Sequence, residues 1–189
     1  MELKRNRIIS AVRTDSEFRA ALEAPPMCIF LLNADLLSLG KEFRAAHACG
    51  KRVFVHMDLA RGVGKDKEGV QVLKSIGADG MISTRTSLLK QAKECGLHTV
   101  LRVFIMDSHA GDIAVQAAKT AGADMLEIMP GIVPKMITRI SSQVQVPVIA
   151  GGLIETPEEV MTALRAGASA ISSGNQALWQ LPAMGEKII

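Results

Sequence analysis

The sequence predicts an α/β fold, a small TIM-like (β/α)8 barrel that forms a single domain over residues 1–189. Short apolar runs typical of buried parallel strands alternate with helical patterns along the whole chain. Gly77-Ala-Asp, Gly122-Ala-Asp and Gly167-Ala-Ser each end a helical pattern and lead into a strand, at equal intervals of 45 residues (122 − 77 and 167 − 122). This interval fits two βα units with a glycine C-cap. The rival open doubly wound sheet has no strand-GxGxxG-helix fingerprint to support it.

The first half of the chain contains four strand patterns, each followed by a helical one. Strands are predicted over residues 8–12, 27–32, 53–58 and 81–83, and the helices end near residues 22, 48, 76 and 95. Thr14 or Ser16 caps the first helix, and two prolines stop it before the second strand. Gly50 follows the second helix, and a polar, glycine-bearing loop over residues 59–66 follows the third strand. These breakers separate the elements as a βα series requires.

The second half continues the same alternation. Strands are predicted over residues 99–106, 125–129, 147–150 and 170–173. Helices follow them from residue 107 or 108 to 121, from 134 to 142, from 157 onwards and, in a short final turn, after Asn175. Thr156, Pro157 and Glu159 form a complete start signal for the seventh helix, because threonine caps it, proline occupies the first position and glutamate closes the capping box.

Glycines follow the last two strands. Gly151 and Gly152 come directly after the seventh strand, and Gly174 follows the eighth. Barrel enzymes hold phosphate with the loops after these two strands and the N-terminus of an extra helix. We therefore expect the N–H groups of Gly151, Gly152, Ser173 and Gly174, with hydroxyl groups from Ser172 or Ser173, to hold the phosphate of a small molecule.

Composition narrows the class of protein. Apolar residues make up 48% of the chain, yet no apolar run is long enough to span a membrane. The N-terminus lacks the pattern of a signal peptide, and three cysteines without CxxC spacing suit reduced thiols, so a cytoplasmic protein is expected. The net charge of +3 neither establishes nor excludes an RNA partner. With no tyrosine and one tryptophan, an aromatic sheet for stacking bases is not expected.

Polar residues at the carboxyl ends of the strands are the candidates for ligand contacts. Asp58 and Lys65 suit recognition of hydroxyl and phosphate groups. Arg102 and Glu127 are expected to face each other across adjacent strands, either as a structural ion pair or as ligand contacts. Asp107 fits a helix cap and a ligand contact equally well.

The same residues do not form a catalytic pattern. Asp58, Lys65 and Glu127 have the chemistry of an acid or base, and His56 is better explained as a core histidine. No nucleophile–base pair or metal triad accompanies them, so we assign no catalytic or metal-binding residue and no cofactor.

Several stretches together resemble the glycerol-3-phosphate-responsive antiterminator family along nearly the whole chain. They are Phe54-Val-His-Met-Asp-Leu59, Lys65-Asp66, Asp79-Gly-Met-Ile-Ser-Thr84, Arg102-Val-Phe-Ile-Met-Asp-Ser108, Glu127-Ile-Met-Pro-Gly131, Ala150-Gly-Gly-Leu-Ile154 and Leu178-Trp179. The resemblance implies a barrel-shaped regulator, not an enzyme. Such a regulator binds the leader mRNA of glycerol-utilisation genes and prevents termination when its effector, glycerol 3-phosphate, is present.

Carried over by position, the resemblance places phosphate at Gly151, Gly152, Ser173 and Gly174. Glycerol hydroxyls then lie near Asp58, Arg102 and Glu127. The last strand departs from the family, because it reads Ser-Ser-Gly where members tend to have Ser-Thr-Ser. This puts side-chain contacts to phosphate in doubt and leaves backbone contacts intact.

Five basic residues of the loops and helix starts are candidates for contacts with RNA phosphates. They are Arg61, Lys65, Lys67, Arg85 and Lys135, although a solvated surface explains each one singly. Two alternatives to the antiterminator stay open: a phosphosugar enzyme such as an isomerase or aldolase, and a ligand-binding relative without RNA binding. A homodimer or a higher homo-oligomer is compatible with the sequence.

Overall fold

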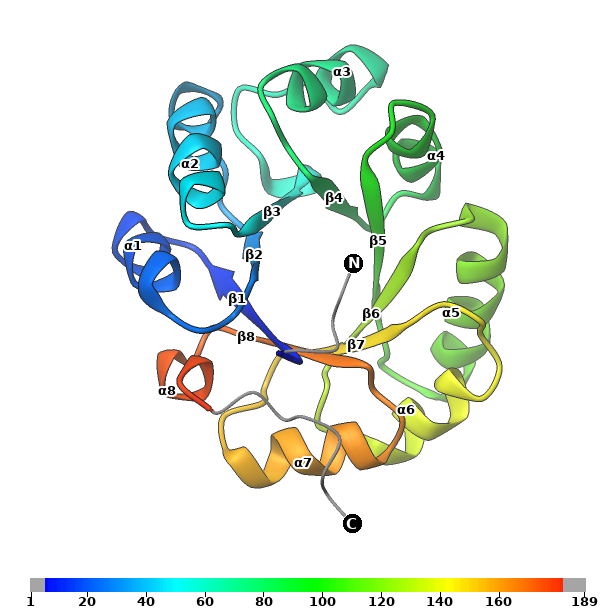
Figure 1. The fold of residues 1–189 in the computed structure, drawn as a ribbon. Helices are drawn as coiled ribbons and strands as arrows, with labels where there is room; N and C mark the ends of the chain where they lie inside the picture. The colour runs from blue at the N-terminus through cyan, green and yellow to red at the C-terminus, as the bar shows by residue number, and fades with distance from the viewer. Residues whose placement is uncertain (1–5, 182–189) are drawn as a thin grey trace.

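Eight parallel strands close into a barrel, with a helix after each strand on the outside (Figure 1). The structure is a computed structural model that describes residues 6–181. Each strand pairs with the next one along the chain, and β8 pairs with β1 to close the ring. The predicted (β/α)8 barrel is thus confirmed. The two ends of the predicted domain, residues 1–5 and 182–189, lie outside the described residues.

The elements follow the predicted order. The strands are β1 (Ile8–Val12), β2 (Cys28–Leu31), β3 (Arg52–His56), β4 (Gly80–Ser83), β5 (His98–Phe104), β6 (Met125–Met129), β7 (Val148–Gly151) and β8 (Ala170–Ser173). The helices are α1 (Asp15–Glu23), α2 (Leu36–Ala48), α3 (Lys67–Ser75), α4 (Thr86–Glu94), α5 (Ser108–Ala121), α6 (Pro134–Ser141), α7 (Pro157–Arg165) and α8 (Gln176–Trp179), with a 3-10 turn, η1 (Met57–Leu59), after β3.

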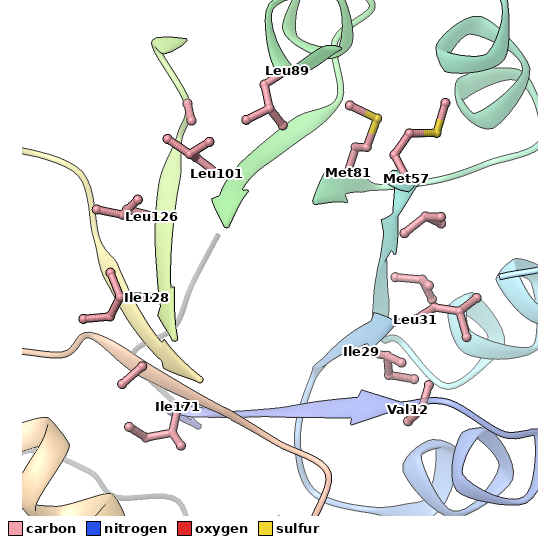
Figure 2. Packing of buried hydrophobic residues seen from close by; sticks show 14 of the residues in the cluster. Val12, Ile29, Leu31, Met57, Met81, Leu89, Leu101, Leu126, Ile128 and Ile171 are labelled. Atoms are coloured by element: carbon pink, nitrogen blue, oxygen red, sulfur yellow. The ribbon is translucent and has the colours of Figure 1, made fainter. Parts of the chain in front are cut away.

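Alternation along the strands builds two apolar layers, because successive side chains point to opposite faces of a sheet. Inward-facing residues such as Phe30, Phe54 and Val100 fill the barrel. Outward-facing residues pack against the helices, and Figure 2 shows several of them directed away from the barrel axis, among them Ile29 and Leu126. The interior of the barrel is therefore a packed core.

The helix boundaries bear out the capping signals of the sequence. Capping boxes open α1, from Thr14 to Glu17, and α7, from Thr156 to Glu159. The repeated glycines Gly77, Gly122 and Gly167 all have positive φ angles, as a left-handed C-cap requires.

Two strands end two residues earlier than predicted. β3 ends at His56, so Asp58 lies in the 3-10 turn η1 and not at the end of a strand. The turn forms because the Ala60 N–H donates to the Met57 carbonyl at 3.2 Å. β5 ends at Phe104, since Asp107 is extended and caps α5.

Candidate functional site

A cavity of about 390 Å³ opens at the carboxyl ends of the strands. This volume lies in the range of about 300–1,000 Å³ that is typical of small-molecule sites. It is surrounded by residues in or directly after β1, β2, β5, β6 and β8 and by the loops after β7 and β8. These residues are Ala11, Arg13, Leu32, Arg102, Glu127, Met129, Gly152, Leu153, Ile154, Glu155, Ser172, Ser173, Gly174 and Asn175. Six of the ten predicted ligand contacts are in this set: Arg102, Glu127, Gly152, Ser172, Ser173 and Gly174.

A buried chain of charged and polar groups forms the floor of the cavity. Arg102 and Glu127 are register partners on β5 and β6, and the Arg102 Nε donates to the Glu127 Oε2 at 2.6 Å. The Ser172 Oγ donates to the other carboxylate oxygen, Oε1, at 2.5 Å. Glu127 is fully buried and Arg102 is 6% exposed. The ion pair that the sequence left as one of two interpretations is therefore present, and it also borders the cavity.

The Arg102 guanidinium keeps donors for a ligand. Within residues 6–181 its only hydrogen bond is the one from Nε to Glu127. Arg102 lines the cavity, and its Nη groups make no hydrogen bond within residues 6–181. A guanidinium in this position donates to hydroxyl or anionic oxygens, while Glu127 neutralises its charge.

The two glycine loops have different roles. A Cβ at Gly151 would lie 2.5 Å from the Ser172 Oγ and 2.6 Å from the Glu127 Oε1, so this glycine makes room for the buried chain. Gly152 lines the cavity with a φ of 74°, and Gly174 lines it from the loop after β8. Among the described residues, the N–H groups of Gly152 and Gly174 have no hydrogen-bond acceptor. Free N–H groups beside a cavity are suited to an anionic ligand.

The hydroxyl groups of β8 already have partners in the protein. Ser172 donates to Glu127, and the Ser173 Oγ donates to the Ile154 carbonyl at 3.1 Å. Ser173 also accepts from the Asn175 N–H at 3.1 Å. Each hydroxyl has one proton to donate, so these serines tie the loops together and leave the backbone N–H groups as the free donors.

Asp58 lies away from the cavity and organises a neighbouring loop. Its carboxylate accepts from the Ser83 Oγ at 2.9 Å and from the Thr84 N–H at 2.7 Å, and it lies 3.6 Å from the Arg85 Nε. Burial by itself would raise the pKa of Asp58, but the hydrogen bonds from Thr84 and Ser83 outweigh it and hold the pKa below its usual value. This carboxylate thus fixes the start of α4.

Lys65, Asp107 and Gly151 are also absent from the cavity lining. The Lys65 Nζ donates to the Ala60 carbonyl within its own loop, and burial lowers its pKa. Asp107 accepts from the Ala110 N–H at 2.7 Å as the cap of α5, which is one of its two predicted roles.

Arg13 is a cavity residue that the sequence prediction missed. It follows β1, and its Nη1 lies 3.1 Å from the place that a Cβ on Gly174 would occupy. Glycine at position 174 therefore lets an arginine reach the loop after β8. The rule that polar residues after barrel strands serve the site would have included Arg13.

The predicted RNA-contact residues are scattered around the same end of the barrel. Arg61 pairs with Asp35 at 3.1 Å, and Arg85 lies near Asp58. Lys67 and Lys135 lie exposed in the first turns of α3 and α6.

The described residues offer neither a metal site nor a membrane-spanning helix. No group of three or more histidine, cysteine or acidic residues in the described part of the chain is placed to hold a metal ion. No helix within residues 6–181 is long and apolar enough to cross a membrane.

Residues 8–179 match the model of the family described as "Glycerol-3-phosphate responsive antiterminator". The chain belongs to this antiterminator family. The resemblance inferred from the sequence motifs is confirmed, and it covers all eight strands.

Relatives of the antiterminator family match over nearly their whole length. The glycerol uptake operon antiterminator regulatory protein of Listeria monocytogenes is 31% identical, with a TM-score of 0.90, over 95% of this chain and 98% of that one. A glycerol uptake operon antiterminator-related protein of Thermotoga maritima is 35% identical, with a TM-score of 0.83, over 94% and 99%. The uncharacterized protein YgcP of Escherichia coli is 31% identical over 95% of this chain and 94% of its own. Aldolase structures that are at most 18% identical share the fold alone.

Proposed function

We propose that this protein senses glycerol 3-phosphate and acts as a transcription antiterminator, binding the leader mRNA of glycerol-utilisation genes and preventing premature termination. The observation that carries the proposal is the family match over residues 8–179. The cavity supports it, because a polar floor and two free glycine N–H groups suit a small phosphorylated polyol.

The two ends of the cavity suit the two ends of this effector. Its phosphate would bind the N–H groups of Gly152 and Gly174, with the Arg13 guanidinium beside them. Its hydroxyl groups would meet the Arg102 Nη donors and the Glu127 carboxylate on the floor. Backbone donors have fixed positions, so they bind phosphate without the entropy cost of ordering a side chain.

The cavity lining also favours a sensor over a phosphosugar enzyme. Within the described residues it contains no lysine, cysteine or histidine. A Schiff-base aldolase needs a lysine there, and an acid–base isomerase needs groups that are free to exchange protons. Of the two carboxylates in the lining, Glu127 holds two hydrogen bonds inside the protein, and Glu155 is exposed on the loop after β7.

The first prediction concerns ligand binding by the full chain, followed as thermal unfolding. Glycerol 3-phosphate at about 100 times its Kd should stabilise the folded state by about 2.7 kcal/mol, because it binds only that state. For a chain of this size we expect the Tm to rise by about 5–10 °C. Glycerol and inorganic phosphate at the same concentration should give much smaller shifts.

Two glycine variants make this test specific. Gly174→Val places a side chain at the cavity, where a Cβ meets only the Nη1 of the exposed Arg13 at 3.1 Å and the Ala11 carbonyl at 3.5 Å. It should fold and lose the shift. Gly40→Val on α2, where a Cβ has only the Arg44 Nη1 at 3.5 Å, should keep it. A shift with inorganic phosphate alone, or none with glycerol 3-phosphate, would contradict the sensor and favour a different phosphorylated ligand.

A further inference from the structure

Four large apolar side chains lie exposed on consecutive loops beside the cavity, and we call them the apolar arc. Phe104, Met106, Ile132 and Leu153 are 57%, 88%, 41% and 63% exposed. They come from the ends of β5, β6 and β7, which are neighbours in the barrel. Monomeric proteins rarely expose apolar side chains in a continuous group unless another molecule binds there.

Hydrogen bonds hold the loops of the apolar arc together. The Ile105 N–H donates to the Met129 carbonyl at 2.7 Å, which joins the end of β5 to β6. The Gly131 N–H donates to the Gly151 carbonyl at 2.6 Å, which joins the loops after β6 and β7. The apolar arc is therefore a fixed surface and borders the cavity at Leu153.

Phe104 is the one exposed aromatic side chain in the part of the chain that the structure describes. The other aromatic residues there, Phe18, Phe30, Phe43, Phe54 and Trp179, are buried. Phe104 is two residues beyond Arg102, so it points to the barrel mouth, and its register partner on β6 is Met129, which lines the cavity. The sequence led us to expect no aromatic stacking surface, and composition could not show that one of the five phenylalanines lies at the mouth.

Positive charge flanks the apolar arc at the start of α6. Lys135 is exposed, the N-cap Val133 offers no side-chain acceptor, and the first turn contains no acidic residue. Arg139, one turn later on the same face, donates to the Ser108 carbonyl at 3.4 Å at the start of α5. Lys135 therefore lies on the face of α6 that contacts the start of α5. The nearby Asp107 carboxylate is occupied by the cap of α5.

We infer that the apolar arc is the surface on which unpaired bases of the RNA dock, with one base stacked on Phe104. The inference rests on the proposed function and assigns it a place on the molecule. Exposed bases need an aromatic or apolar platform, and the strand that carries them needs nearby cations. The apolar arc and Lys135 supply both, which favours a nucleic acid over an uncharged protein surface.

The same placement gives the ligand a route to the RNA. Leu153 follows Gly152 and has a φ of 62°, in the left-handed region that favours glycine and is strained for a leucine. A phosphate bound to the Gly152 N–H would hold this turn and therefore fix Leu153 at the edge of the apolar arc. Ligand binding would thus favour the docking surface without any large movement of the barrel.

The test is a titration of the transcribed leader RNA of the glycerol-uptake operon with the full chain and glycerol 3-phosphate at several salt concentrations. Phe104→Ala should weaken binding about tenfold or more, and Phe104→Trp should retain it. The slope of log affinity against log salt should not change in Phe104→Ala, because stacking releases no counterions. Lys135→Gln should reduce the slope by about one. Ile113→Ala, which shortens an exposed side chain on α5, is the matched control.

The outcomes separate this inference from the function on which it rests. If the unaltered protein binds the RNA and Phe104→Ala binds it equally well, the docking surface is wrong and the antiterminator stands. If the unaltered protein shifts its Tm with glycerol 3-phosphate and binds no leader RNA, the docking surface and the antiterminator both fail, and only the sensor stands. If Phe104→Ala dissociates an oligomer when no RNA is present, the apolar arc is a protein interface and the inference is overturned. Thermal unfolding of each variant shows that it is folded.

Discussion

At the scale of single residues, His56 shows how the barrel interior controls protonation. It lies on the inward face of β3, is 4% exposed, and its buried Nδ1 has no hydrogen-bond partner within residues 6–181. The pKa of His56 is lowered from 6.5 to about 4, mainly by burial and secondly by the nearby positive charge of Arg102. The imidazole therefore stays neutral in the folded protein at pH 7, as expected for a core histidine.

This pKa predicts how stability depends on pH. Between about pH 6.5 and pH 4 the unfolded chain binds a proton at His56 and the folded chain does not, so stability falls as the pH falls through this window. The effect amounts to at most about 3 kcal/mol and is absent above pH 6.5. His56→Gln should flatten the urea-unfolding free energy over this range relative to the unaltered protein. Parallel curves would show that His56 is protonated inside the barrel.

Residue positions were predictable from the sequence where strand order alone decides them. Arg102 and Glu127 were expected to meet because they occupy equivalent places on neighbouring parallel strands. Asp58 was misplaced because the chain leaves β3 two residues earlier and turns into η1, where Ser83 and Thr84, far along the sequence, hold the Asp58 carboxylate. Contacts of this kind leave no local signal.

At the scale of secondary structure, the repeated glycines are the clearest link between sequence and fold. Gly122 and Gly167 both end helices with a positive φ, yet their surroundings differ. A Cβ at Gly122 meets nothing within 4 Å, whereas a Cβ at Gly167 would lie 2.5 Å from the Ser141 Oγ.

The difference predicts an order of stability. Gly122→Ala should cost about 1 kcal/mol, because only the left-handed backbone opposes it. Gly167→Ala should cost more, since Ser141 must also move. Urea unfolding of the two variants measures both values, and equal costs would mean that the Ser141 side chain rotates away freely.

Element type and order were predictable because each boundary carries its own local chemistry. The capping boxes of α1 and α7 and the prolines at the starts of α6 and α7 are visible in the sequence. The ends of β3 and β5 were not, since apolar residues continue beyond both strands and only tertiary hydrogen bonds decide where pairing stops.

At the scale of the whole molecule, closing the ring brings β1 beside β8 and so places Arg13 next to the loop of Gly174. The cavity is therefore assembled from both ends of the chain, and the apolar arc continues it over the loops of β5 to β7. Effector and RNA would share one end of the barrel, with Gly152 and Leu153 between them. A coupling free energy between the two ligands is the direct consequence.

The most direct test of this account is the affinity of the full chain for the leader RNA with and without saturating glycerol 3-phosphate. We expect the effector to tighten RNA binding by about 5- to 150-fold, the usual range of such coupling. By linkage, saturating RNA should tighten glycerol 3-phosphate binding by the same factor. An RNA affinity that is equal with and without glycerol 3-phosphate would contradict the account.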